Sequence, residues 1–450
     1  MNRILAIIAC SVCCCITATN ATAQRVLTLA QIKDSALQNN IAIRSARYDI
    51  EAAQQQRKET FTKYFPSISG TGVWFNANKG MAQATINPAE FISPELQSSL
   101  ATLFPPELLG ALASPFDISM LKNGTVGSLT AVQPVFAGGQ IINGNKLAKV
   151  GEEVSRLQMQ LSEQEVERTA EQYFWQLVSL EEKMKTIDAI DALLRDIHKD
   201  VDVAVQAGVV LPNDRLQVEI RQNDVESQKL KVANSISIIR LLMTQYCGLR
   251  DTSFTISYQT DVSSPVSLKQ DHQQALLSTA EFQLLGKQVE AAGLQKKLAV
   301  GQNLPSVAVG AGYTYHNLMD TDNSFGMVFA TVSVPISDWW GGSHAIKRKA
   351  IAHQKAQEQQ ADNAELLKIR MQNAWNGVEE SYKQLQITQK GITQAEENLR
   401  LHRNFYQAGT CKMSDFLEAQ LLYQQACDKH TDAFAGYQNK LLEYKQSVGQ

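Results

Sequence analysis

The chain contains two copies of one motif, in the same order and with the same internal spacing. A Gln-Ala-Gly triplet ends at Gly208 and again at Gly409, and each copy is followed six residues later by Asp and two residues after that by Leu. A second pattern also recurs, at Pro134 and Pro335: a proline is followed by an aliphatic residue and, a few residues later, by a Gly-Gly pair. Self-similarity with preserved order indicates the duplication of one structural unit. The expected unit is helix, strand, strand, long helix, tight turn, helix.

The first 23 residues have the pattern of a secretory signal. Arg3 precedes an apolar run that ends near Ile16, and Ala21-Thr22-Ala23 provides the small residues of a cleavage site. The mature protein is therefore expected to leave the cytoplasm. An alternative is a lipid attachment site at Cys10, which follows a short apolar stretch.

Charge and cysteine content exclude some classes of protein. Of 42 Lys and Arg residues, Arg3 leaves with the signal, so 41 basic side chains face 45 acidic ones and nothing suggests nucleic acid as a partner. Cys247, Cys411 and Cys427 remain after cleavage. Cys411 and Cys427 would lie roughly 24 Å apart along a helix, too far for a disulfide. We interpret all three as packing residues.

Four segments have the character of strands. No stretch after the signal has the 18 or more apolar residues of a membrane-spanning helix, so any crossing is expected to use strands. In residues 307–315 large apolar groups alternate with small or polar ones, as in a lipid-facing strand, although a soluble sheet with one buried face shows the same alternation. Four strands cannot close a barrel, but three copies of the chain would supply twelve. The predicted strands are Ser67 to Phe75, Thr125 to Phe136, Val307 to Tyr315 and Phe325 to Ile336.

Helix lengths provide an independent argument. Residues 140–206 contain no proline and would form a helix of about 67 residues, roughly 100 Å long, and residues 343–407 repeat this. The flanking helices hold about 35 residues each, so two stacked end to end match one long helix. The predicted flanking helices are Gln31 to Phe65, Pro212 to Tyr246, Leu268 to Asn303 and Ser414 to Ser447.

The long helices have a narrow apolar seam on a polar surface. Val150, Val154 and Leu157 belong to a run of apolar residues that steps by three and four, as in a coiled coil. A narrow seam suits a wall that is wet on both sides, such as a tube. An ordinary rod-like coiled coil remains an alternative.

The segment between the first two strands is about 38 residues longer than its counterpart in the second repeat, and loops of that length are usually functional or mobile. We expect it outside the cell, where it could narrow a pore mouth. It contains an apolar run and five prolines: Leu108 to Leu112, Pro88, Pro94, Pro105, Pro106 and Pro115.

Together with the signal and the paired strands, Tyr406-Gln407-Ala408-Gly409 and Asp415 make residues 24–450 resemble the TolC family of outer-membrane efflux proteins. The resemblance implies a fold that is mainly α with membrane β: a homotrimer with a 12-stranded β-barrel, four strands per chain, continuing into a long periplasmic α-helical barrel. It implies a location in the outer membrane, lipid around the strands, and a periplasmic adaptor and an inner-membrane pump (RND or ABC type) as partners. The protein would be a passive exit duct for efflux or type I secretion, with no cofactor.

On this resemblance the chain divides into a signal peptide (1–23), a first repeat (24–247), an equatorial linker (248–267) and a second repeat (268–450). A periplasmic coiled-coil adaptor or structural rod is the alternative function. An enzyme is not expected, since no HExxH, nucleophile elbow or phosphate loop is present. No metal site is expected either.

The resemblance also indicates site residues. Gly208 and Gly409 would lie at the tip turns where the adaptor docks, although glycine also serves as an ordinary helix C-cap. Asp214 and Asp415 have capping-box spacing to Gln217 and Glu418, so we expect them to cap the following helices.

In some members of the family, polar side chains close the periplasmic tip of the duct, and this gate differs in the present chain. Where some members have arginine and tyrosine partners for an aspartate equivalent to Asp214, this chain has Glu396 and Gly391. Where members place two acidic residues in the lumen, it has Arg400 and Arg403. We expect Glu396 to pair with Arg400. Arg403 either faces solvent or contributes to a positive ring in the lumen.

Overall fold

The structure of the chain is a computed structural model, which describes residues 25–93, 96, 100, 114–120, 122–259, 262, 264–318 and 321–450. The predicted signal, the possible lipid attachment at Cys10 and the apolar run at 108–112 lie outside these residues. Contacts divide the chain into two compact units. Unit 1 comprises Met1–Ala53, Gly151–Val289 and Lys355–Gln450, and unit 2 comprises Gln54–Val150 and Glu290–Gln354. Each predicted repeat contributes to both units.

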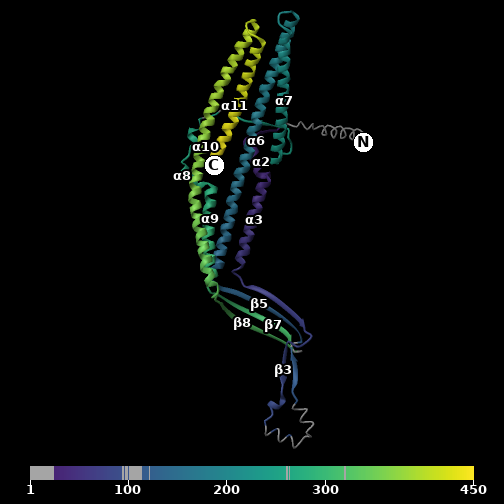
Figure 1. Cartoon of the computed structure of the whole chain (residues 1–450), viewed down its shortest axis with the longest axis vertical. Helices are drawn as coiled ribbons and strands as arrows, with labels where there is room; N and C mark the ends of the chain where they lie inside the picture. Colours follow the sequence, from purple (N-terminus) through teal and green to yellow (C-terminus); the bar gives the residue numbers. More distant parts are fainter. Residues whose placement is uncertain are drawn as a thin grey trace, which may run out of the picture. The chain divides into compact units, whose positions relative to one another are not determined.

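Long helices dominate the described residues (Figure 1). Two hairpins of a long and a shorter helix, α6 with α7 and α10 with α11, follow one another in the chain. None of the described helices is both long and apolar enough to span a membrane. The helices are α2 (Leu29–Asn39), α3 (Ile41–Thr62), α6 (Gln140–Gln206), α7 (Pro212–Cys247), α8 (His272–Ser278), α9 (Ala280–Gln302), α10 (Asp338–Gln407) and α11 (Met413–Ser447).

Two of the predicted flanking helices are interrupted, at Asn40 and at Thr279. The backbone is extended at both residues. The Asn40 side chain accepts a hydrogen bond from the backbone N–H of Ala42 at 2.8 Å, and the Thr279 hydroxyl accepts one from Phe282 at 3.4 Å. These side chains satisfy the free N–H groups of a new helix, so the predictions of one continuous helix at each place were wrong.

Unit 1 has two apolar cores. In the first, aromatic rings from α6, α10 and α11 pack together, including Phe174, Trp375 and Tyr444, each 1% exposed or less. The second lies toward the turn between α6 and α7 and is mainly aliphatic. It comprises Ile187, Ile190, Leu194, Ile197, Val201, Val218, Val225, Met413 and Phe416.

A short parallel strand pair also lies in unit 1. β1 (Arg25–Thr28) pairs with β6 (Phe254–Ser257), so the predicted linker 248–267 contains a strand. Neither strand was predicted, because four residues are too few to show a period of two.

Unit 2 contains a four-stranded antiparallel sheet with the order β2-β5-β7-β8 (Figure 1). Its strands are β2 (Ser67–Asn76), β5 (Asn123–Ala137), β7 (Ser306–Leu318) and β8 (Thr321–Ser333). They overlap the four predicted strands, but β7 continues to Leu318, beyond Tyr315, and β8 runs from Thr321 to Ser333, not from Phe325 to Ile336. Among the described residues, β2 and β8 each pair on one side only, so the sheet has two free edges.

The register of the sheet makes one face richer in exposed apolar side chains than the other. Because neighbouring residues in a row point to the same face, Ile68, Leu129, Val309, Tyr313, Val328 and Val332 share one face, and they are 42–86% exposed. The other face carries most of the Ser and Thr side chains together with several large apolar ones. It includes Ser69, Thr71, Ser128, Thr130, Gly310, Gly312, Thr314, Val73, Phe325, Met327 and Phe329.

The long segment between β2 and β5 contains a second hairpin. β3 (Ala82–Ile86) pairs antiparallel with β4 (Phe116–Met120), and one turn of 3-10 helix, η1 (Pro88–Glu90), follows β3. The predicted prolines Pro94, Pro105 and Pro106 lie outside the described residues.

Candidate docking and gating site at the helix tips

The turns that join the paired helices have the same geometry. Gly208 has φ +72° and Gly409 has φ +71°. In the first turn the N–H groups of Gly208 and Val209 donate to the carbonyls of Val205 and Ala204 at 3.0 and 2.9 Å. In the second, the equivalent N–H groups of residues 409 and 410 donate to residues 406 and 405, both at 2.9 Å. This is the Schellman motif, which needs a left-handed residue and so favours glycine. Both predicted tip turns are therefore C-caps, and their docking role stays a prediction.

The two aspartates do not cap the following helices as predicted. Asp214 and Asp415 are each the third residue of their helix, and the residues at the N-cap are Leu211 and Lys412, which make no side-chain capping bond. The capping-box prediction was wrong for both. In α7, Pro212 takes the first helical position, because its missing N–H costs nothing there. The two carboxylates instead lie in the first turn, where the positive end of the helix dipole favours them.

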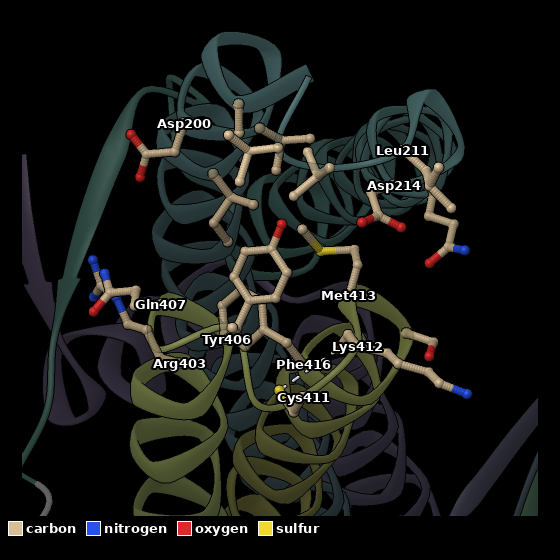
Figure 2. Close-up of a pocket in the computed structure, with 18 of the residues that line it drawn as sticks. Asp200, Leu211, Asp214, Arg403, Tyr406, Gln407, Cys411, Lys412, Met413 and Phe416 are labelled. Atoms are coloured by element: carbon tan, nitrogen blue, oxygen red, sulfur yellow. Dashed lines mark hydrogen bonds between the residues drawn. The ribbon is translucent and has the colours of Figure 1, made fainter. Parts of the chain in front are cut away.

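A groove of about 700 Å³ separates the two turns within unit 1. Its floor is apolar: the rings of Tyr406 and Phe416 stack with centroids 5.9 Å apart and planes at 14°, and Met413 and Phe416 are each 1% exposed. Figure 2 shows the Tyr406 ring standing in the middle of the groove. Burial raises the pKa of the Tyr406 hydroxyl, and the nearby carboxylate of Asp214 adds to the effect.

The walls of the groove carry opposite charges. Asp200 and Asp214 come from the first hairpin, while Arg403 and Lys412 come from the second (Figure 2). None of these four side chains forms an ion pair with another described residue. An apolar floor with separated acidic and basic walls suits a protein surface better than a small charged ligand.

The two arginines of the predicted gate have different surroundings. Arg400 is exposed and donates two hydrogen bonds to Glu397, both at 2.7 Å, which lower the pKa of that carboxyl. The prediction that Arg400 pairs with Glu396 was wrong, because Arg400 forms its ion pair with Glu397, three residues before it. Arg403 is exposed and lines the groove.

Sequence reasoning missed a buried polar cluster close to this site. Arg221 of α7 is 9% exposed and contacts two glutamines of α11, Gln420 and Gln424. A signal was available: Arg221 lies between Val218 and Val225 at the spacing of an apolar helix face. Among the described residues, no group of three His, Cys, Asp or Glu side chains could hold a metal ion.

Comparisons with known proteins agree with this architecture. Residues 272–450 match the sequence model of the family described as “Outer membrane efflux protein”. No curated protein sequence matches the chain.

Solved structures match nearly the whole chain. CusC, whose crystal structures concern folding and transmembrane channel formation, is 13% identical with a TM-score of 0.75, covering 94% of this chain and 92% of that one. The outer membrane protein VceC of Vibrio cholerae is 16% identical with a TM-score of 0.73, covering 94% and 96%. The outer membrane channel MtrE of Neisseria gonorrhoeae, in its open state, is 14% identical with a TM-score of 0.71, covering 94% and 88%.

The fold is therefore that of the TolC-type outer-membrane channels, and the predicted fold class is confirmed. Residues 272–450 match the model of the outer membrane efflux protein family, and the fold of the chain is similar to that of outer-membrane channels. Both similarities favour the efflux duct over the adaptor or rod.

Proposed function

We propose that three copies of this chain form the outer-membrane exit duct of a tripartite efflux or type I secretion system. The observation that carries the proposal is the sheet of unit 2, which has one face rich in exposed apolar side chains and two edges that are unpaired among the described residues. Lipid does not tolerate unpaired backbone groups, so β2 and β8 require partners from other copies. Four strands from each of three copies make the twelve of a closed barrel, with the more apolar face toward lipid and the face that holds most of the Ser and Thr side chains toward water.

This part of the proposal is tested by crosslinking the protein after detergent extraction from outer membranes. The largest covalent species should contain three chains. A stable monomer in the outer membrane would contradict the barrel.

The helices supply the periplasmic part of the duct. α6 has 67 residues and α10 has 70, and each is roughly 100 Å long at 1.5 Å per residue. A duct of this kind is passive. We propose that it opens when a periplasmic adaptor, itself bound to an inner-membrane pump, docks on the turns at Gly208 and Gly409.

Docking is tested by placing large side chains at the two turns. A Cβ added at Gly208 or Gly409 meets no atom within 4 Å, so a large side chain there would project from the turn. The double variant Gly208→Trp, Gly409→Trp should abolish export and still form trimers. The double alanine variant is the matched control, since it carries the same cost of positive φ, about 1–2 kcal/mol at each site, without the bulk. Normal export by the tryptophan variant would argue against docking at these turns.

The gate charge is a separate part of the proposal. If Arg403 faces the lumen, three copies form a ring of positive charge, and a narrow pore lined by one sign of charge selects against that sign. Reconstituted channels should then prefer anions, and Arg403→Asp should shift the reversal potential in a salt gradient toward cation selectivity. Arg400→Asp is the control, because Arg400 is paired with Glu397 on an exposed face. An unchanged reversal potential in Arg403→Asp would mean that Arg403 faces solvent on the outside of the duct and not the lumen.

A further inference from the structure

The buried arginine near the tips has no carboxylate partner. The Arg221 Nε donates to Gln420 Oε1 at 2.8 Å, and its Nη2 donates to Gln424 Oε1 at 2.7 Å. No described carboxylate forms an ion pair with it. Burial lowers the pKa of the guanidinium, and the charge of Asp224 opposes that effect only in part. A guanidinium stays ionised in proteins, so a full positive charge is buried here with hydrogen bonds to neutral amides and none to a described carboxylate.

The amides are themselves deeply buried. Gln420 is 0% exposed and Gln424 is 3% exposed. Gln424 Nε2 donates to Gln228 Oε1 at 2.5 Å, which returns the network to α7. Gln420 Nε2 is buried and has no acceptor among the described residues. The network is therefore incomplete in this arrangement, and water would complete it.

The cluster connects the two hairpins. Arg221 and Gln228 belong to α7, while Gln420 and Gln424 belong to α11. Arg221 lies nine residues after the start of α7 and Gln420 seven after the start of α11, so both are within roughly 14 Å of the turns. Around them the hairpins meet through apolar side chains, with Met413 and Phe416 in the same cluster as Val218 and Val225.

We propose that Arg221, Gln420 and Gln424 form the tie that holds the tips of this duct closed, and that docking opens the duct by separating α7 from α11 and hydrating Arg221. The inference rests on the proposed function. With the hairpins together, the amides compensate the buried charge. With the hairpins apart, water does so and also satisfies Gln420. The free energy of the cluster is therefore similar with the hairpins together and with the hairpins apart.

Charge burial predicts effects that do not add. Removing the acceptors while keeping the charge penalises the closed state heavily, whereas replacing the whole polar group by apolar side chains of similar volume is neutral or stabilising. Gln420→Leu with Gln424→Leu should raise the conductance of trimers in planar bilayers by about tenfold or more. Arg221→Met leaves two neutral amides buried without their donor, so it should raise conductance by less than the double leucine variant does. The triple variant should return to the wild-type level.

Arg240→Met is the matched control. Arg240 lies on the same helix, but its partner, Glu181 at 2.8 Å, belongs to α6 of the same hairpin. Conductance should not change in this variant. Trimer yield on gels verifies that each variant folds.

The outcomes separate the tie from the duct. If the cluster only packs the hairpins, the effects of Arg221→Met and of the double leucine variant should add and the triple variant should be the most open, which would overturn the tie. Conducting channels with the same conductance in all variants would also overturn it. If the wild type and every variant form trimers that never conduct, the proposed duct fails, and the tie fails with it.

Discussion

The long helices α6 and α10 are similar in length, with 67 and 70 residues, but their C-terminal halves, next to the tip turns, pack differently. α6 presents five buried aliphatic side chains before its turn. The residues 201 positions later in α10 are more polar or smaller, and only Thr388 among them is buried. The pairs are Ile187 and Thr388, Ile190 and Gly391, Leu194 and Ala395, Ile197 and Asn398, and Val201 and His402.

The comparison teaches that duplication preserved the turns but not the apolar seam. In this region one apolar cluster combines seven buried side chains of the first hairpin with only two of the second, Met413 and Phe416. Leu399 and Tyr406 of α10 are partly buried against it, and Gln420 and Gln424 contact Arg221. A hairpin with less apolar anchoring separates at lower cost. The second hairpin is therefore the one that we expect to move.

The largest expected effect comes from equivalent truncations in the two seams. Ile197→Ala truncates a side chain that is 7% exposed and should destabilise the first hairpin near its tip turn by about 2–5 kcal/mol. Asn398→Ala, at the equivalent position in α10, should change stability by less than about 0.5 kcal/mol. Amide hydrogen exchange of α6 and α10 in the trimer measures both. Equal loss of protection would break the comparison.

A smaller effect distinguishes two glycines of the second hairpin. Gly409→Ala forces alanine into a left-handed conformation and should cost about 1–2 kcal/mol. Gly391→Ala replaces a glycine inside α10 where an added Cβ meets nothing within 4 Å, so it should stabilise the helix by roughly 0.5–1 kcal/mol. Thermal unfolding of the two variants checks the opposite signs. Destabilisation by Gly391→Ala would mean that this helix face is already occupied in the trimer.

The smallest effect is a pH dependence of the second hairpin. His430 Nδ1 lies 3.2 Å from the hydroxyl of Thr388, and burial lowers the pKa of the imidazole below its ordinary 6.5. The unfolded chain therefore binds the proton more readily. The contribution to stability is present above pH 6.5 and is lost as the pH falls through the lower folded-state pKa. Unfolding temperatures measured from pH 7.5 to 5 should fall more steeply for the wild type than for His430→Gln. Parallel curves would contradict this.

Much of the fold could be predicted because its boundaries have local causes. Gly208 and Pro212 mark the end of one helix and the start of the next, so α6 and α7 begin and end within one residue of the prediction. The strands show in the alternation that the membrane requires. The breaks at Asn40 and Thr279 were missed because apolar periodicity continues through them, and only the side-chain hydrogen bonds reveal the interruption.

The site was harder to predict because it depends on which helices meet. Arg221 is adjacent in space to residues about 200 positions away, and no local pattern indicates that α7 packs against α11 there. The capping roles of Asp214 and Asp415 were misjudged for another reason. Capping-box spacing is common by chance, and the proline at the start of α7 decides the boundary.

The central claim is that the free edges of the sheet are completed by other copies of the chain. The most direct measurement places one cysteine on β2, at Ser69, and a second on β8, at Asn323, Phe325 or Met327 in turn, after replacing Cys247, Cys411 and Cys427 by serine. Oxidation in the outer membrane should, at one of these registers, give a covalent species of three chains and none larger. Bridges confined to single chains, or a ladder that continues beyond three, would contradict the account.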